Sequence, residues 1–183
     1  MTRTPLKQAK HLRNFPASIP ISAEQVLEFH AARLLLLLHV AGQQGAIEGL
    51  TKLAKLDFFV RYPEFFERAI GHRTEQRGPV ESAMMRYRYG PWDPRYYDVL
   101  AFLESRDLLK VRRHGKSFGF SLTATGSYAA GMLSNTQQFA EQIAQISRVA
   151  HHFGDKTGNW LKNHIYSVFD AEVTQVRLGE VIE

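Results

Sequence analysis

The hydrophobic and polar positions of residues 88–126 follow first a helical period and then a strand period. Apolar side chains recur at helical spacing from Asp93 to about Arg106, which predicts an amphipathic helix. Asp93 before Pro94 is a typical helix start, because the carboxylate accepts from free first-turn amides and proline at the first position loses no hydrogen bond. We therefore expect a helix that begins at Asp93 and ends near Arg106.

The stretch that follows predicts a two-stranded hairpin over residues 108–122. Gly115 stands where a tight turn needs a positive φ, and Phe118 and Phe120 alternate with smaller residues after it. Thr123 is placed to cap the next helix. A helix followed by such a hairpin is the second half of a winged helix. The expected fold class is therefore mainly α with a small β wing (α+β), a winged helix-turn-helix core with additional C-terminal helices.

The segment before this core predicts two helices. Ser22 opens a capping box with Gln25, and the leucine run of residues 34–38 makes the helix that ends at Gly42 apolar almost all round. A helix of this kind is normally central in the packing. A second, amphipathic helix is predicted over residues 47–61.

Shorter elements lie between these helices and the core. Pro63 begins a short helix to about Ile70, and the polar residues 71–79 predict a loop. Residues 84–89 alternate and predict a short strand that pairs with the hairpin. After the hairpin, residues 126–153 predict one long or two consecutive helices.

The domain organisation follows from these patterns. Residues 1–20 predict a basic N-terminal arm, because prolines interrupt them and they have no apolar period. Residues 21–170 form the winged-helix domain with its helical extension, whose last helix we expect Asp155 to cap. Residues 171–183 are a tail that either packs along the domain or is held by a partner chain.

Composition narrows the classes of protein. The 183 residues are 44% hydrophobic and 22% charged, as in an ordinary globular chain. Cysteine is absent, which excludes disulfides and thiolate metal sites and fits a reducing compartment. No export signal is evident and no apolar run is long enough to span a bilayer, so we expect a cytoplasmic protein. The formal net charge of +5 favours a polyanion or an acidic protein as partner.

Candidate catalytic motifs fail on spacing. Residues 115–117 (GKS) resemble the end of a phosphate-binding loop, but the glycine required five residues earlier is Lys110. His151, His152 and Asp155 are possible metal ligands by type. However, adjacent histidines on a helix point in different directions, and no further ligand at a suitable spacing completes a known metal-binding pattern. We therefore expect no catalytic residues, no metal and no cofactor, and predict that the protein is not an enzyme.

The basic hairpin is the candidate nucleic-acid site. Its cations are Lys110, Arg112, Arg113, His114 and Lys116, joined by Arg86, Arg88 and Arg95 if the short strand lies alongside. Cationic side chains on a protruding hairpin can meet phosphates, and the helix from Asp93 can lie in a groove. The alternative is that a solvent-exposed hairpin is polar in any case, and charged strands discourage edge pairing.

Aromatic residues are the candidate partner-binding side chains. They are Trp92, Tyr96, Tyr97, Trp160 and Phe169. For Trp92, Tyr96 and Tyr97 the alternative is a core or boundary position, which is more common than a base-stacking platform. In the first hypothesis given below, the aromatic surfaces make protein contacts.

Three segments resemble a known family: LTKLAKLDFFVRYP at 50–63, YGPWDPRYYDVLAFLESRDLL at 89–109 and FGDKTGNWLKNHIYSVF at 153–169. They resemble the middle components of bacterial ABC-three-component defence systems, the group that includes the Lamassu accessory subunit. The resemblance covers most of the chain from about Ala31. It implies a winged-helix protein that sits on an SMC/Rad50-like ATPase beside an effector, often a nuclease, and helps turn sensing of phage or plasmid DNA into effector release.

Two hypotheses about function remain open. In the first, the protein is a non-enzymatic accessory subunit of an antiviral ATPase complex, with the ATPase and the effector as partners, double-stranded DNA as a candidate ligand of the hairpin, and no membrane contact. In the second, it is a free winged-helix DNA-binding transcription regulator or antitoxin, since the YGPW segment at 89–92 is also similar to that of Panacea-type antitoxin domains. A regulator usually dimerises to match two half-sites.

Overall fold

The structure is a computed structural model that describes residues 25–72, 84–87, 90–169 and 177–182. The predicted arm at 1–20 and most of the predicted loop at 71–79 lie outside the described residues. The described elements, in chain order, are α1 (Leu27–Ala41), β1 (Ala46–Glu48), α2 (Leu50–Arg61), α3 (Pro63–Ala69), β2 (Met85–Tyr87), β3 (Gly90–Trp92), α4 (Tyr96–Ser105), β4 (Leu109–His114), β5 (Ser117–Leu122), α5 (Ala124–Ser134), a 3₁₀ turn (Gln137–Phe139), α6 (Ala140–Phe153) and α7 (Gly158–Val168). The protein is a mixed α+β structure with small antiparallel sheets.

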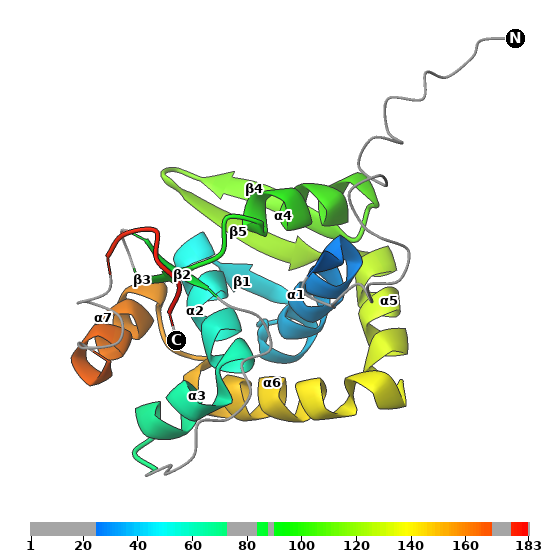
Figure 1. Ribbon diagram of the computed structural model, residues 1–183. Helices are drawn as coiled ribbons and strands as arrows, with labels where there is room; N and C mark the ends of the chain where they lie inside the picture. The colour runs from blue at the N-terminus through cyan, green and yellow to red at the C-terminus, as the bar shows by residue number, and fades with distance from the viewer. Residues whose placement is uncertain (1–24, 73–83, 88–89, 170–176, 183) are drawn as a thin grey trace, which may run out of the picture.

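Helix α1 lies at the centre of the molecule, between the three-stranded sheet and α6 (Figure 1). It packs against α4, α5, α6 and β5, and the leucines at 34–38 are at most 2% exposed. This confirms the expected central helix. The helix begins at Leu27, where Val26 has an extended backbone and offers no side-chain cap. Ser22, the predicted capping residue, lies outside the described residues.

A short strand stands where the sequence predicted the start of the second helix. Residues 46–48 form β1, which pairs with β5, and α2 begins only at Leu50. The reason is the backbone at Gly49, whose φ of 93° separates strand from helix, a region that glycine adopts without a steric cost. Ile47 is still buried, which explains why its position looked like part of a helical face.

The hairpin predicted at 108–122 is confirmed. Strands β4 and β5 pair from Leu109↔Leu122 to His114↔Ser117 and leave Gly115 and Lys116 as a two-residue turn. Gly115 has a φ of 59°, as the first central position of a type II′ turn requires. The strands form a sheet in the order β1-β5-β4, and α4 packs beside β4.

Thr123 caps α5 as predicted, because its hydroxyl oxygen accepts from the backbone N–H of Gly126 at 2.9 Å. The following helical region is two helices, α5 and α6, joined by the 3₁₀ turn. The last helix begins later than predicted: Thr157, not Asp155, caps α7 by accepting from the N–H of Trp160 at 3.2 Å. Gly158 permits this start, since a Cβ there would lie 2.8 Å from the backbone nitrogen of Lys52 on α2.

The strand predicted at 84–89 does not pair with the hairpin. Residues 85–87 form β2, which pairs with β3 in a separate two-stranded sheet. Described tail residues lie beside β2: the N–H of Arg86 donates to the carbonyl of Glu180, and the N–H of Ile182 donates to that of Met84, both at 2.8 Å. Ile182 is buried, so this part of the tail packs along the domain.

The helix expected from Asp93 begins at Tyr96. Asp93 instead opens a preceding turn, in which its carboxylate accepts from the backbone N–H of Arg95 at 2.9 Å and its carbonyl from the N–H of Tyr96 at 3.2 Å. A short polar side chain that bonds its own backbone two residues on favours a turn over a helix.

Candidate functional site

The basic residues of the hairpin are all exposed, and three of them share one face of the sheet. Lys110, Arg112 and His114 alternate along β4, so they point to the outer face of the sheet, and Lys116 lies in the turn. All of them, and Arg113, are exposed. The opposite face of the hairpin carries Leu109 and Phe120, which are buried against the helices. The alternation thus separates a face with Lys110, Arg112 and His114 from an apolar face that ends in the exposed Arg113. We call these four residues and Lys116 the basic hairpin.

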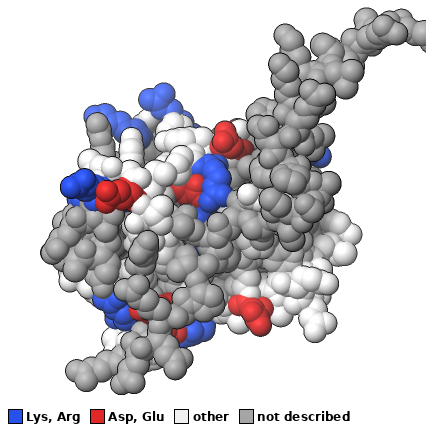
Figure 2. All heavy atoms as spheres, viewed as in Figure 1, with Lys and Arg blue, Asp and Glu red and all other residues white. Residues whose placement is uncertain are grey.

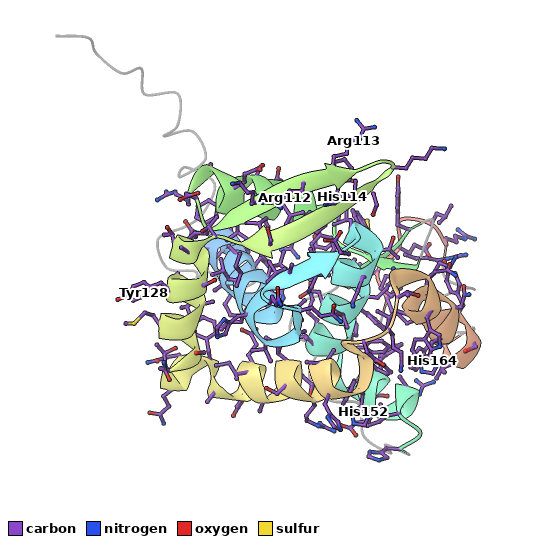
Figure 3. The ribbon with its side chains drawn as sticks, turned by 180° about the vertical axis from the view of Figure 1, so that it is seen from behind. Arg112, Arg113, His114, Tyr128, His152 and His164 are labelled. Atoms are coloured by element: carbon purple, nitrogen blue, oxygen red, sulfur yellow. The ribbon has the colours of Figure 1, made fainter. Side chains whose placement is uncertain are left out.

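The basic hairpin lies at the opposite end of the molecule from α6 (Figure 3). Arg113 is at its tip, where its Nε donates to the carbonyl of Gly115 at 3.0 Å. Figure 2 shows Lys and Arg atoms at the upper left edge, over the end of the hairpin.

No carboxylate forms an ion pair with the basic hairpin within the described residues. The nearest acid across the outer face is Glu48 of β1, whose carboxylate covers Gly119, the residue that separates Glu48 from Arg112 in the sheet register. A second acid, Glu104 of α4, accepts from the N–H of Val111 at the edge of β4. The four Lys and Arg side chains outnumber these two acids and leave the surface able to bind an anion.

The three other predicted cations do not join the basic hairpin. Arg86 belongs to β2, which pairs with β3. Arg88 lies outside the described residues. Arg95 turns inward, where its Nη2 is 2.8 Å from Oδ2 of Asp93. The sequence grouped them on the assumption that their strand lay beside the hairpin, and the structure places that strand elsewhere.

A buried ionic network, which sequence reasoning missed, joins α1, α2 and α4. Its first centre is Asp57, which is 0% exposed. The carboxylate accepts from Nε of Arg33 at 2.7 Å and from the hydroxyl of Tyr96 at 2.7 Å, with Nη1 of Arg61 at 3.5 Å. Burial alone raises the pKa of a carboxyl, but here the charges of Arg33 and Arg61 hold the pKa of Asp57 below its ordinary value.

The second centre of the network is Asp93. Its carboxylate accepts from Nη1 of Arg61 at 2.9 Å and from Arg95. Despite partial burial, the hydrogen bonds of Arg95 and the charge of Arg61 lower the pKa of Asp93 to about 2. The ring of His30 lies between two guanidiniums, with Nε2 2.9 Å from Nη1 of Arg95 and Nδ1 3.1 Å from Nη2 of Arg33. The network fixes the start of α4 on α1 and α2, and it was visible in the sequence only as charges within otherwise apolar helices.

The candidate partner-binding aromatics separate into two groups. Tyr96 and Phe169 are buried, at 2% and 0% exposed, so neither offers a surface. Trp92 is half-buried, whereas Tyr97 and Trp160 are 64% and 41% exposed. Trp160 stacks on His164 with ring centroids 4.7 Å apart at the end of the molecule occupied by α7 (Figure 3).

The solvent face of α4 is acidic. Asp98 and Glu104 are exposed on it, and Glu104 faces β4, where its Oε1 accepts from the N–H of Val111 at 3.4 Å. Arg95 at its start is paired with Asp93, which leaves the exposed Arg106 at its end. A helix of this composition is poorly suited to the phosphate-lined groove in which we expected it to lie.

Comparisons with protein-family models, with curated proteins and with solved structures give no match. In the described part of the chain, no helix is long and apolar enough to cross a membrane. Among the same residues no group of three or more His, Cys, Asp or Glu could hold a metal ion; His151 and His152 are exposed on α6.

Proposed function

We propose that this protein is a non-enzymatic accessory subunit of an SMC/Rad50-like ATPase defence complex, in which its basic hairpin contacts foreign DNA through phosphates. The order α1, β1, α2, α4, β4, β5 with the sheet order β1-β5-β4 fits a winged helix into which α3 and the β2–β3 sheet are inserted. This connectivity supports the winged-helix part of the proposal.

The observation that carries the DNA contact is the basic hairpin itself. Four exposed Lys and Arg side chains and His114 lie on one hairpin without an ion-pair partner in the described residues. They are suited to phosphates, which carry no sequence information. Each phosphate contact contributes about 0.9 to the slope of log affinity against log salt. Four such contacts, from Lys110, Arg112, Arg113 and Lys116, give weak binding at physiological salt, so the subunit relies on the complex to hold it at DNA.

The acidic face of α4 favours a protein that binds DNA independently of its sequence over a sequence-specific regulator. A free regulator inserts its recognition helix into the major groove, where Asp98 and Glu104 would meet the phosphate field. The second hypothesis, a transcription regulator or antitoxin, is therefore less well supported. The exposed Tyr97 and Trp160 are the aromatic residues best placed to contact the ATPase or effector.

The test replaces Arg112, Arg113 and Lys116 by glutamate and measures DNA binding over a salt range, beside co-purification with the products of adjacent genes. We expect binding to weaken similarly for duplexes of different sequence, and the salt slope to fall by roughly 2 to 3. A matched variant that places glutamate at the exposed or half-buried Arg106, Lys156 and Arg177 changes the net charge equally and should bind almost as the parent does.

Other outcomes separate the roles of the hairpin. Lost assembly with unaltered DNA affinity would make the hairpin a docking surface for the ATPase. Intact assembly with unchanged DNA binding would remove the hairpin from both roles.

A further inference from the structure

A pocket of about 190 Å³ lies between the first half of α2 and the β2–β3 sheet. Its lining includes Leu50, Ala54, Lys55, Tyr87, Trp92 and Tyr97. Tyr87 and Tyr97 are 49% and 64% exposed, whereas Lys55 is 2% exposed. The pocket therefore opens to solvent between the two tyrosines and has the lysine amine toward its inner end.

Lys55 is a buried amine with unused hydrogen-bonding capacity. Its Nζ donates to the carbonyl of Pro91 at 2.8 Å, and an ammonium group has three donors. No carboxylate pairs with it in the described part of the chain; the nearby charge is Lys162 of α7, which repels it. Buried charges in proteins are normally paired, so the pocket has a place for one anionic group.

The walls of the pocket are flat and apolar. Trp92 stands between the two tyrosines, with its ring centroid 6.2 Å from that of Tyr87 and 5.8 Å from that of Tyr97. Leu50 and Ala54 of α2 also line it. Aromatic rings pack well against such surfaces in offset or tilted arrangements. An aromatic wall alone would also suit an organic cation, but the amine of Lys55 opposes one.

We propose that this pocket binds a small planar organic acid, with its ring among Tyr87, Trp92 and Tyr97 and its carboxylate on Nζ of Lys55. The size fits, because an apolar cavity of about 150 Å³ holds benzene and this one is larger by the room that a carboxylate needs. The carboxylate accepts the free N–H groups of Lys55, and the ring displaces water from apolar walls. The inference is independent of the proposed DNA contact, since none of these residues belongs to the basic hairpin.

Calorimetric titration of the full chain at pH 6, where the amine of Lys55 is protonated, tests the proposal. The probes are benzoate, cinnamate and indole-3-acetate, each beside its primary amide, with benzyltrimethylammonium as a cationic comparison. We expect at least one acid to bind at least ten times more tightly than its amide, and the cation not to bind. Lys55→Met should weaken the acid roughly 10- to 100-fold, as loss of a charge-assisted hydrogen bond implies, and leave the amide nearly unchanged. Lys156→Met is the matched control: this lysine does not line the pocket and pairs with Asp155, so the variant should bind as the parent does.

A second variant keeps the test decisive if Lys55→Met does not fold. Tyr97 is exposed, so Tyr97→Ala leaves the core intact and should weaken acid and amide alike by removing one wall. Equal affinity for acid and amide, tighter binding of the cation, or no binding of any probe acid at millimolar concentration would each overturn the assignment.

Discussion

Lys55 illustrates how one side chain links folding to pH. Burial, and to a smaller extent the charge of Lys162, lower the pKa of Lys55 to about 7 from an ordinary 10.5. Between these two values the unfolded chain holds a proton that the folded chain has released. The free energy of unfolding therefore rises with pH across this range, in contrast to a group whose folded pKa is raised.

Replacing this lysine should remove that pH dependence. From pH 7 to pH 9 the parent protein gains up to about 2 kcal/mol of stability from Lys55, at ~1.4 kcal/mol per fully developed pH unit. Lys55→Met should lack this gain, so its stability difference from the parent changes by that amount. Urea unfolding at pH 7, 8 and 9 measures it, with Lys116→Met as the control that should follow the parent. Parallel curves for the parent and Lys55→Met would contradict a buried, neutralised amine.

Among the elements, the β4–β5 hairpin depends most on a single position. Gly115 has a φ of 59°, and a Cβ added to it would meet no neighbouring atom within 4 Å, so a substitution there costs backbone strain and nothing else. A side chain in this region is unfavourable by about 1–2 kcal/mol, and a β-branched one is a clear outlier. The turn thus holds the two strands in register, and with them Lys110, Arg112 and His114 on one face.

Gly115→Val should therefore destabilise the protein by about 1–2 kcal/mol and weaken DNA binding without changing any charge. Thermal unfolding and a DNA titration at low salt measure the two effects. Gly131→Ala is the opposite control: this glycine lies within α5 with open space around it, so alanine should stabilise by up to about 1 kcal/mol. A Gly115→Val protein as stable as the parent would show that the turn is not strained by a side chain.

Local signals made the hairpin and the central helix predictable from sequence. Gly115, Thr123 and the leucines at 34–38 each act through their immediate neighbours or through an apolar face, and all three predictions are confirmed. Strand β1 was missed because Ile47 stands three residues before Leu50 and so continues a helical face.

Features that depend on contacts between residues far apart in the sequence could not be predicted from local patterns. Arg33 and Asp57 are separated by 24 positions, and Arg61 and Asp93 by 32, so nothing in their local sequence identifies them as partners. The pocket at Lys55 requires the β2–β3 sheet to lie beside α2. The sequence instead predicted that residues 84–89 pair with the hairpin, which hid the pocket and placed Arg86 at the wrong surface.

At the scale of the whole molecule, the polar groups are divided between an interior network and an outer hairpin. The acids and arginines of the network are committed to each other, whereas the basic hairpin is open to a ligand. Among the described residues, no group of three or more His, Cys, Asp or Glu could hold a metal ion.

The purified protein alone should neither hydrolyse nucleotides nor cleave DNA, because its sequence has no phosphate-binding loop. Phosphate release from ATP and nicking of a supercoiled plasmid in the presence of Mg²⁺ or Mn²⁺ measure both activities. A known ATPase and a known metal-dependent nuclease, assayed in parallel, serve as the positive controls. Metal-dependent cleavage that co-elutes with a clean monomer and persists in repeated preparations would refute this expectation.

The interior network around Asp57 also constrains how this protein can evolve. Loss of one partner leaves a buried charge without compensation, at a cost of about 3–5 kcal/mol, whereas exchange of the whole set for apolar residues is often neutral or stabilising. Single substitutions at these positions are thus selected against, and the positions are expected to change together. Descendants of a common ancestor should carry Arg33, Asp57, Arg61 and Tyr96 together, or should have exchanged them together for a packed apolar cluster.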